Sequence, residues 1–414
     1  MVTKSSLALY GGKPVRTEPL PVMHPGSSHI DEEETNAVLE ILKSQSLYRF
    51  YGPKFMNITG KFEKEFKEYI GVKYALAVSS GTAALHCALV GLGAGAGDEV
   101  ILPTYGWVAC PDAIFASGAT PVLANIDESL TLDPTDVEDK ITNRTKIILA
   151  VHIRGVPCDL DALSKIARKY QVLLLEDVAQ CGGGTYHGKK LGSIGDAGSF
   201  SFQLNKMISA GEGGAVVTND ATTYERAVMI HDVGTPYRAF SEKDFKFTVK
   251  PFPGVNYRQN EISSAILRVQ LKKMDALVSK IRNNKAIVKK GMSDISGVKF
   301  RKQPDPQGEV AVGLVFFVET PEKAREFRDA LRAENIRTES GAYPGVLYDP
   351  AVTDGHVFLH WGHIIKGVER VRDKYSQSIN LMSRAVHLDI SPLLGESELK
   401  DIDTAIHKVA DVIL

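Results

Sequence analysis

The residues best suited to chemistry lie in three polar segments of the sequence. Ser79-Ser80-Gly81-Thr82 stands directly before an apolar helical pattern, and the free N–H groups of a helix N-terminus favour an anion such as phosphate. Glu176-Asp177 ends an apolar run, where a buried carboxylate needs a cation or a hydrogen-bond donor as its partner. Lys206 follows a β-prone run, and a partly desolvated lysine has a lowered pKa and can form a Schiff base with a carbonyl.

Each of these segments also has an ordinary structural interpretation. Ser and Thr are common helix N-caps, acids often end strands, and an isolated lysine usually extends to solvent. The combination is more informative, because a phosphate cradle, a buried carboxylate and a sequestered lysine form the set that pyridoxal phosphate requires. The carboxylate keeps the pyridine nitrogen protonated and the lysine holds the aldehyde, so we predict this cofactor.

Alternating strand and helix patterns must position these segments. Runs that are apolar throughout alternate with helical patterns, which predicts an α/β fold with a mainly parallel sheet covered on both faces by helices. Ligands of such sheets bind beyond the carboxyl ends of the strands. We expect strands over 74–78, 100–102, 121–126, 146–153 and 172–175, and helices over 79–92, 107–118, 134–141 and 159–170.

The sequence as a whole predicts a chain of three parts. Residues 1–30 are expected to be irregular, residues 31–275 to form a large cofactor-binding domain, and residues 276–414 to form a smaller C-terminal α/β domain. The pattern Ser28…Asp31 predicts the cap of the first helix. The aromatic-rich stretch 233–256 either walls a substrate pocket or packs in the core. Further helices are expected near 60–70, 259–293, 321–335 and 397–413, and β runs over 198–202, 214–218, 298–300 and 310–318.

Composition excludes several classes of protein. The 414 residues are 43% hydrophobic, and 49 Lys and Arg oppose 50 Asp and Glu, giving a net charge of −1. A disordered chain is excluded, a nucleic-acid binder is disfavoured, and no apolar run is long enough to span a membrane.

Four scattered cysteines without a Cys-x-x-Cys pair argue against structural zinc, so we expect no metal. With no apolar signal core near the N-terminus, we expect a cytoplasmic location.

A series of motifs, in the same order along the chain, matches a known family. The chain resembles the DegT/StrS family of sugar aminotransferases, which have the fold-type I (aspartate aminotransferase-like) architecture and use pyridoxal phosphate. This resemblance implies a large domain with a mainly parallel, seven-stranded mixed sheet flanked by helices, and a smaller C-terminal domain. The matching motifs are Ser80–Leu85, Gly97–Pro103, Glu176–Gln180, Gly192–Gly198, Ser201–Lys206, Gly211–Thr218 and Asn256–Arg258.

The resemblance also implies roles for the residues beside the cofactor ring. Lys206 would carry the Schiff base and act as general acid and base, and Asp177 would pair with the pyridinium nitrogen. Trp107 would stack on the pyridine ring. Gln180 would lie near the 3′-oxygen, where many family members have His, a departure that keeps a hydrogen-bond donor.

For the cofactor phosphate, the resemblance implies a second set of residues. Gly81, Thr82 and Ser201 would hold the phosphate, and Asn256 would contact it from the neighbouring subunit. A homodimer with shared active sites follows from that last role.

Arg154 is a departure from the family pattern. The chain reads His152-Ile153-Arg154-Gly155 where family members often have His-Leu-Tyr-Gly. A cation at this strand end could bind a substrate carboxylate with two hydrogen bonds, either from the amino donor or from an acidic sugar. A structural ion pair with a nearby acid is the alternative.

The predicted reaction is amino transfer from L-glutamate or L-glutamine to a keto-sugar, a nucleotide-linked keto-sugar or a ketocyclitol. The N-terminal segment 7–16 is similar to aminotransferases for inosose-type cyclitols and antibiotic sugars. The region from Pro304-Asp305-Pro306 onward resembles the family member that aminates the 8-position of a keto-octulosonate, so the acceptor stays open. A sugar dehydratase or an oxidase on the same scaffold is the alternative. Dehydratases of this family typically replace the lysine with His, and Lys206 is present.

Overall fold

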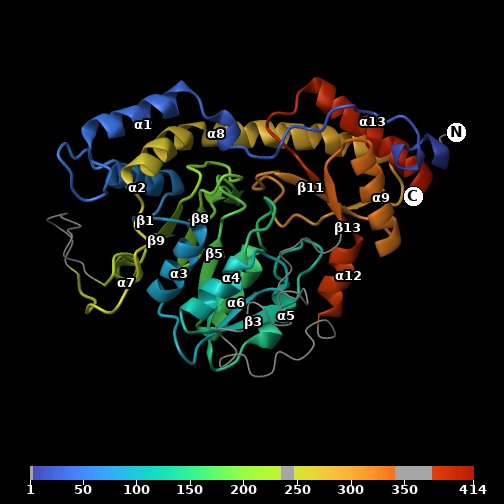
Figure 1. Cartoon of the computed structure of the whole chain (residues 1–414). Coiled ribbons are helices and arrows are strands. Elements are labelled where there is room, and N and C mark those ends of the chain that lie inside the picture. Colours follow the sequence, from blue (N-terminus) through green and yellow to red (C-terminus); the bar gives the residue numbers. More distant parts are fainter. Residues whose placement is uncertain (1–2, 235–246, 341–374) are drawn as a thin grey trace.

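A seven-stranded mixed sheet forms the centre of the large unit in the computed structural model, which describes residues 3–234, 247–340 and 375–414 (Figure 1). The strand order is β1-β9-β8-β5-β4-β2-β3, and only β9 runs antiparallel to its neighbours. The predicted α/β fold with a mainly parallel, seven-stranded mixed sheet is therefore confirmed. The strands are β1 Tyr74–Val78, β2 Glu99–Pro103, β3 Thr120–Ala124, β4 Thr145–Val151, β5 Leu173–Asp177, β8 Ala197–Ser201 and β9 Gly214–Thr218.

Helices cover both faces of this sheet because its strands are apolar on both sides. Successive residues of one strand fall into separate apolar clusters: Ile148 and Ala150 belong to one, and Ile147 and Leu149 to the other. Helices α2, α6 and α8 pack in the first cluster, and α3, α4 and α7 in the second. These helices are α2 Ile58–Ile70, α3 Gly81–Gly91, α4 Ala109–Ala116, α6 Leu160–Tyr170, α7 Ala221–His231 and α8 Glu261–Gly291, with α5 Pro134–Lys140 between β3 and β4.

A smaller antiparallel sheet lies beside the large unit. Its strand order is β10-β11-β13-β12, and helices α9, α12 and α13 accompany it. Figure 1 shows α8 running from beside α1 towards this smaller sheet, and α8 contacts α1, α2 and α13. The elements are β10 Lys299–Phe300, β11 Gly313–Phe317, β12 Thr338–Ser340, β13 Ala385–Asp389, α1 Glu32–Ser44, α9 Pro321–Ala333, α12 Ser376–Arg384 and α13 Glu396–Ile413, and a hairpin joins β6 Thr185–Tyr186 to β7 Lys189–Lys190.

The N-terminal segment lies along the small unit. Short 3₁₀ turns occupy Lys4–Ser6, Ala8–Tyr10 and Ser27–His29, so the segment predicted to be irregular has only local structure. The buried carboxylate of Glu334 anchors it by accepting the N–H of Ala8 at 2.9 Å. The predicted domain boundary at residue 275 falls within α8 and stays a prediction.

One helix cap was predicted wrongly. Asp31, not Ser28, caps α1: its side chain accepts the N–H of Glu33 at 2.8 Å, and the Glu34 carboxylate accepts the N–H of Asp31 at 2.9 Å. Ser28 instead lies in the preceding 3₁₀ turn. Of the two residues in the predicted capping pattern, Asp31 therefore satisfies a free backbone donor at the start of α1.

The structure contains several helices and strands that the sequence did not predict. Helices α7 and α12 and strands β12 and β13 were not predicted. Of the aromatic-rich stretch, Tyr237, Phe240 and Phe245 lie outside the described residues, whereas Phe247 and Phe252 pack against the second apolar cluster. Within the described ranges, no helix has the length and apolar character needed to cross a membrane.

Candidate active site

A cavity of about 510 Å³ opens at the carboxyl edge of the large sheet. Its lining comes from the ends of β4 and β5, the start of α3 and the loop after β8, together with residues of the small unit. This is the edge at which parallel sheets bind ligands. The lining includes Gly81, Thr82, Trp107, Arg154, Asp177, Gln180, Ser201 and Lys206, so eight of the nine predicted site residues lie around one space.

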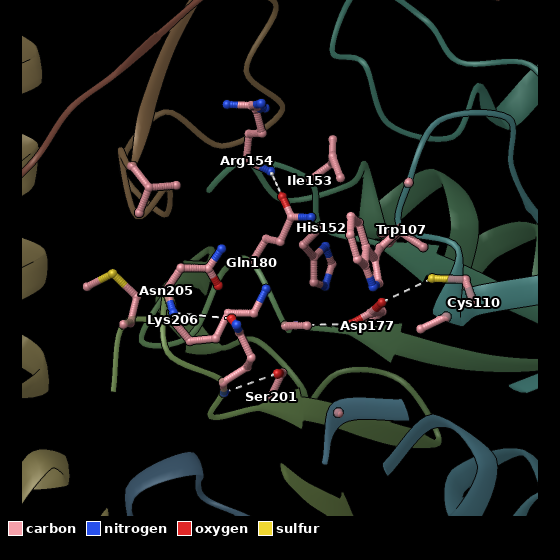
Figure 2. Close-up of a pocket in the computed structure, with 18 of the residues that line it drawn as sticks. Trp107, Cys110, His152, Ile153, Arg154, Asp177, Gln180, Ser201, Asn205 and Lys206 are labelled. Carbon is pink, nitrogen blue, oxygen red and sulfur yellow. Dashed lines mark hydrogen bonds between the residues drawn. The ribbon is translucent and has the colours of Figure 1, made fainter. Parts of the chain in front are cut away.

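Lys206 and Asp177 contribute the reactive functional groups of this cavity. Figure 2 shows the Lys206 side chain extending towards the space beside Asp177, with His152 and Trp107 nearby. Burial lowers the pKa of the Lys206 amine, and the nearby Asp177 carboxylate only partly opposes that effect. The loop that carries Lys206 is fixed by its backbone, since the Lys206 N–H donates to Gln203 O at 2.9 Å and the Gly26 N–H donates to Lys206 O at 3.1 Å.

The Asp177 carboxylate has few protein donors for a buried acid. Its Oδ1 accepts the N–H of Ala179 at 2.9 Å, and its Oδ2 accepts the Cys110 thiol at 3.3 Å. Burial raises the pKa of Asp177, and it outweighs these two bonds and the nearby charge of Lys206. A cationic or protonated partner in the cavity would therefore stabilise the carboxylate.

Glu176, the neighbouring acid, has the opposite surroundings. Successive strand residues point to opposite faces, so Glu176 faces away from the cavity, fully buried. Its oxygens accept the N–H groups of Gly192, Ile194 and Gly195 at 2.7–2.8 Å, and His152 Nε2 lies 3.2 Å away. Because His152 Nδ1 accepts the Cys158 N–H at 3.0 Å, the ring proton lies on Nε2 and is donated to Glu176. Of the predicted acid pair, Asp177 faces the cavity and Glu176 supports the end of its strand.

The start of α3 forms a cradle with room for an anion. Ser80 is the N-cap, and its Oγ accepts the Ala83 N–H at 3.1 Å, which leaves the first N–H groups of the helix directed at the cavity. A Cβ at Gly81 would lie 2.6 Å from Ser201 Cβ, so only glycine fits there. This close approach of α3 and β8 brings backbone donors and the Ser201 hydroxyl to one place.

Gln180 is held by the turn that follows β4. Its Oε1 accepts the backbone N–H of Arg154 at 3.0 Å, which leaves its NH₂ group to donate towards the cavity. Arg154 has a φ of 48°, in the left-handed region that non-glycine residues rarely adopt. The strained turn thus aims the Arg154 N–H at Gln180.

The Arg154 side chain forms an ion pair. Its Nη1 lies 3.2 Å from Asp389 Oδ1, and its Nε donates to the Tyr105 hydroxyl at 3.3 Å. The structural ion pair considered from the sequence is therefore present, in a residue that also lines the cavity. Its role towards a substrate stays a prediction.

Asn256 is the one predicted site residue outside this cavity. It is exposed, it forms a β-bridge with Asp232, and its Oδ1 accepts the Arg258 N–H at 3.3 Å. The predicted contact across subunits needs such exposure, and it stays a prediction.

Sequence reasoning missed Cys110, Tyr105, Arg337 and Asp389, which also line the cavity. Arg337 and Asp389 come from the small unit, more than 130 residues from Lys206, and no local motif marks Arg337. The signal that could have pointed to Asp389 is an acid ending an apolar run, the same signal that identified Asp177.

Comparisons with known proteins agree with this geometry. The family model of the DegT/DnrJ/EryC1/StrS aminotransferase family matches residues 28–407. A GDP-perosamine synthase of Escherichia coli O157:H7 is 37% identical over 70% of this chain and 77% of that protein. A putative L-glutamine:3-amino-2,3-dideoxy-scyllo-inosose aminotransferase of Micromonospora echinospora is 32% identical over 95% of this chain and 90% of that protein.

Solved structures share the fold over nearly the whole chain. The crystal structure of 3-amino-5-hydroxybenzoic acid synthase has a TM-score of 0.80 and 29% identity, covering 95% of this chain and 99% of that chain. DesI, crystallised in the presence of its TDP-sugar product, has a TM-score of 0.79 and 27% identity, covering 98% of this chain and 96% of that chain.

Proposed function

Since the chain belongs to the DegT/DnrJ/EryC1/StrS aminotransferase family, we propose that it uses pyridoxal phosphate to transfer an amino group from L-glutamate or L-glutamine to a keto-sugar, a nucleotide-linked keto-sugar or a ketocyclitol. The observation that carries this proposal is the pairing of Lys206 with Asp177 in one cavity. Relatives named for GDP-perosamine, for scyllo-inosose and for a dTDP-linked amino sugar represent two of the three acceptor classes left open by the sequence, the nucleotide-linked sugars and the cyclitols.

The cavity residues fit the proposed cofactor. The cradle of Gly81, Thr82 and Ser201 would hold its phosphate, and Asp177, a buried carboxylate short of donors, would hold its protonated ring nitrogen. Trp107, which is 53% exposed and lines the cavity, offers a flat face for the ring. When bound, pyridoxal phosphate supplies an electron sink for the charge that develops at the substrate carbon.

Lys206 would move the proton of the reaction. Because burial lowers the pKa of its amine, a larger fraction is unprotonated near neutral pH. Nζ can then take a proton from the substrate carbon and return it to the neighbouring acceptor atom. Such positioned acid–base catalysis is typically worth about 10²–10⁴-fold in rate.

Gln180 would act as a fixed donor beside Lys206. The Arg154 N–H holds its carbonyl oxygen, so its NH₂ group is preoriented to donate to the cofactor's 3′-oxygen. This arrangement explains how the chain can keep the donor that a His supplies in many family members.

Apolar residues on α1 and in the loop that follows support the proposed homodimer. Leu39 and Leu42 on α1 and Leu47, Tyr51 and Phe55 after it are all exposed, and Tyr51 is 64% exposed. A second copy of the chain would bury such a surface. Light scattering should show a dimer that Tyr51→Arg weakens, whereas Ile287→Arg, at an exposed apolar position on α8, should leave it intact.

Shared active sites can be tested by subunit mixing. Lys206→Ala and Asn256→Ala place their defects in one site of a mixed dimer and leave the other site intact, if Asn256 acts on the neighbouring subunit. Refolding equal amounts of both should then restore about a quarter of the wild-type activity. Activity no greater than that of the two separate variants contradicts the shared site.

The four cysteines support a reducing compartment, and we infer a cytoplasmic location. All four are buried, and none forms a disulfide.

The donor reaction tests the proposed function. Wild-type holoenzyme mixed with L-glutamate or L-glutamine, without any acceptor, should release one equivalent of the 2-oxo acid per active site. Lys206→Ala should release none on the same time scale, and Lys61→Ala, on the exposed face of α2, should behave as wild type. No 2-oxo acid from the wild type with either donor contradicts the proposal.

The acceptor is found with a panel of substrates. Keto-sugars, nucleotide-linked keto-sugars and ketocyclitols are offered to the enzyme after it has reacted with the donor, and aminated product is detected by mass spectrometry. Steady release of a water-eliminated sugar in place of an amine would favour the dehydratase alternative.

A further inference from the structure

One carboxylate joins two arginines at the end of the cavity that the small unit builds. Asp389, at the end of β13, lies with Oδ1 3.2 Å from Arg154 Nη1 and with Oδ2 3.7 Å from Arg337 Nε. Arg154 follows β4 of the large unit, and Arg337 directly precedes β12 of the small unit. All three residues line the cavity, so segments far apart in the sequence meet here.

The Arg337 guanidinium has hydrogen-bond donors that its contact with Asp389 does not use. Its side chain is 57% exposed, and only Nε is directed at Asp389. Among the described residues, the interaction of the Arg337 side chain is the one between Nε and Asp389, so Nη1 and Nη2 have no protein partner there. An exposed pair at this separation adds little to stability, whereas the two free ends of a guanidinium match the two oxygens of a carboxylate.

A buried guanidinium lies behind this end of the cavity. Arg301 donates through Nη1 to the Ile153 carbonyl oxygen at 3.0 Å and through Nε to the Ser129 carbonyl oxygen. Burial lowers the pKa of Arg301 to about 10, so it remains charged at neutral pH. His387 on β13 is neutral, because burial and the charges of Arg154 and Arg301 hold its pKa well below the usual range. The surroundings therefore favour an anion.

The order of the side chains along the cavity suits a substrate group away from the reacting carbon. Gln180 lies between Arg154 and Lys206 in Figure 2, and its Oε1 accepts the Arg154 N–H at 3.0 Å. A substrate whose reacting carbon is beside Lys206 can therefore extend towards the arginines, past Gln180.

We propose that Arg337, held in place by Asp389 and assisted by Arg154, binds a carboxylate of the substrate. This inference rests on the proposed function and deepens it, since it assigns a substrate class to the small-unit end of the site. The carboxylate has two possible sources, the amino donor and an acidic sugar acceptor, and the experiment separates them. Arg337 is on this view a specificity residue, and Asp389 positions its guanidinium.

Binding of unreactive probes to the holoenzyme tests the proposal without turnover. Glutarate carries the two carboxylates of glutamate without its amine, and D-glucuronate and D-glucose form a pair of sugars with and without a carboxylate. Saturation-transfer NMR gives the Kd of each for the wild type and for Arg337→Gln, Arg337→Lys and Arg325→Gln. Arg325 is an exposed arginine of α9 that pairs with Glu322 outside the cavity, which makes it a matched control.

At least one carboxylate probe should bind the wild type more tightly than D-glucose does. Arg337→Gln should raise its Kd about tenfold, because charge-assisted hydrogen bonds are lost. Arg337→Lys should recover part of the affinity, and Arg325→Gln should leave it unchanged. An effect on glutarate assigns the site to the donor, and an effect on D-glucuronate assigns it to the acceptor.

Three results would overturn the proposal: carboxylates that bind no better than D-glucose, an Arg337→Gln variant that binds them like the wild type, or an effect confined to added pyrophosphate, which would indicate a diphosphate site. The donor reaction is measured on the same samples. A wild type that binds the probes but releases no 2-oxo acid from either donor overturns the proposed function and leaves the carboxylate site standing.

Discussion

Two adjacent buried acids should respond in opposite directions to loss of charge. Asp177→Asn should stabilise the cofactor-free protein, because burial raises the pKa of Asp177 and its ionised form is therefore disfavoured by folding. Glu176→Gln should destabilise it, since the Glu176 oxygens accept three backbone N–H groups and the His152 ring. A glutamine offers one acceptor oxygen and places an NH₂ group against donors.

The magnitudes follow from the partners of each carboxylate. Asn at 177 can still accept the Ala179 N–H, so it removes a poorly compensated charge at little loss, and we expect a gain of about 1–3 kcal/mol at pH 8. Gln at 176 leaves at least one backbone donor unpaired in a fully buried place, and we expect a loss of about 3–5 kcal/mol.

The pH dependence of the stability difference between Asp177→Asn and the wild type tests the role of Asp177 more specifically than the difference at one pH. A raised pKa in the folded state means that the acid costs nothing below its unfolded pKa of about 3.9, that the cost grows as the pH rises from there to the folded pKa, and that it is constant above the folded pKa. The advantage of Asp177→Asn should therefore be larger at pH 8 than at about pH 4, close to the unfolded pKa. Urea unfolding of the cofactor-free proteins, followed by circular dichroism at both pH values, measures this difference. An Asp177→Asn protein that is less stable than wild type at pH 8, or an advantage that shrinks as the pH rises, refutes the reasoning.

The other predictions concern Gly81 in the anion cradle, Arg154 in the turn after β4, and the thiol of Cys110. Gly81→Ala should cost about 1–3 kcal/mol in urea unfolding because its Cβ would meet Ser201, and adding Ser201→Gly should recover most of that loss; strict additivity of the two changes would contradict the contact. Arg154→Ala should raise KM for the donor or the acceptor in steady-state assays, and an unchanged KM for both would end the carboxylate role of Arg154. Cys110→Ala should weaken cofactor binding by about 2–10-fold in equilibrium dialysis while Cys110→Ser retains it, because only the alanine removes a donor to Asp177; equal affinities would show that the thiol is dispensable.

The sequence predicted most strands and helices of the large unit correctly, because each of them shows a clear apolar pattern within its own residues. Apolar runs of strand length and helical spacing marked β1 to β5 and the helices between them, and strand ends indicated where the cavity opens. The motif set around Lys206 and Asp177 placed the candidate site at that edge, where the structure has it. The family and fold predicted from those motifs are confirmed.

Long-range packing explains what local patterns could not predict. β13 pairs with β11 and β12, strands that lie far away in the sequence, and its short run Ala385–Asp389 carries no helical or turn signal that separates it from α12. For the same reason Arg337 and Asp389 could not be assigned to the cavity, since only the fold brings the small unit to the end of β4. The predicted capping pattern contained both Ser28 and Asp31, and the choice of Asp31 as the cap depends on the local backbone, which the pattern does not specify.

The central claim is that Lys206 holds pyridoxal phosphate covalently opposite Asp177. Borohydride reduction of the purified holoenzyme, followed by proteolysis and mass spectrometry, should find the reduced cofactor on the peptide that contains Lys206, and on no peptide of the Lys206→Ala protein. A label on any other lysine, or no label on a wild type that still transfers amino groups, contradicts the claim.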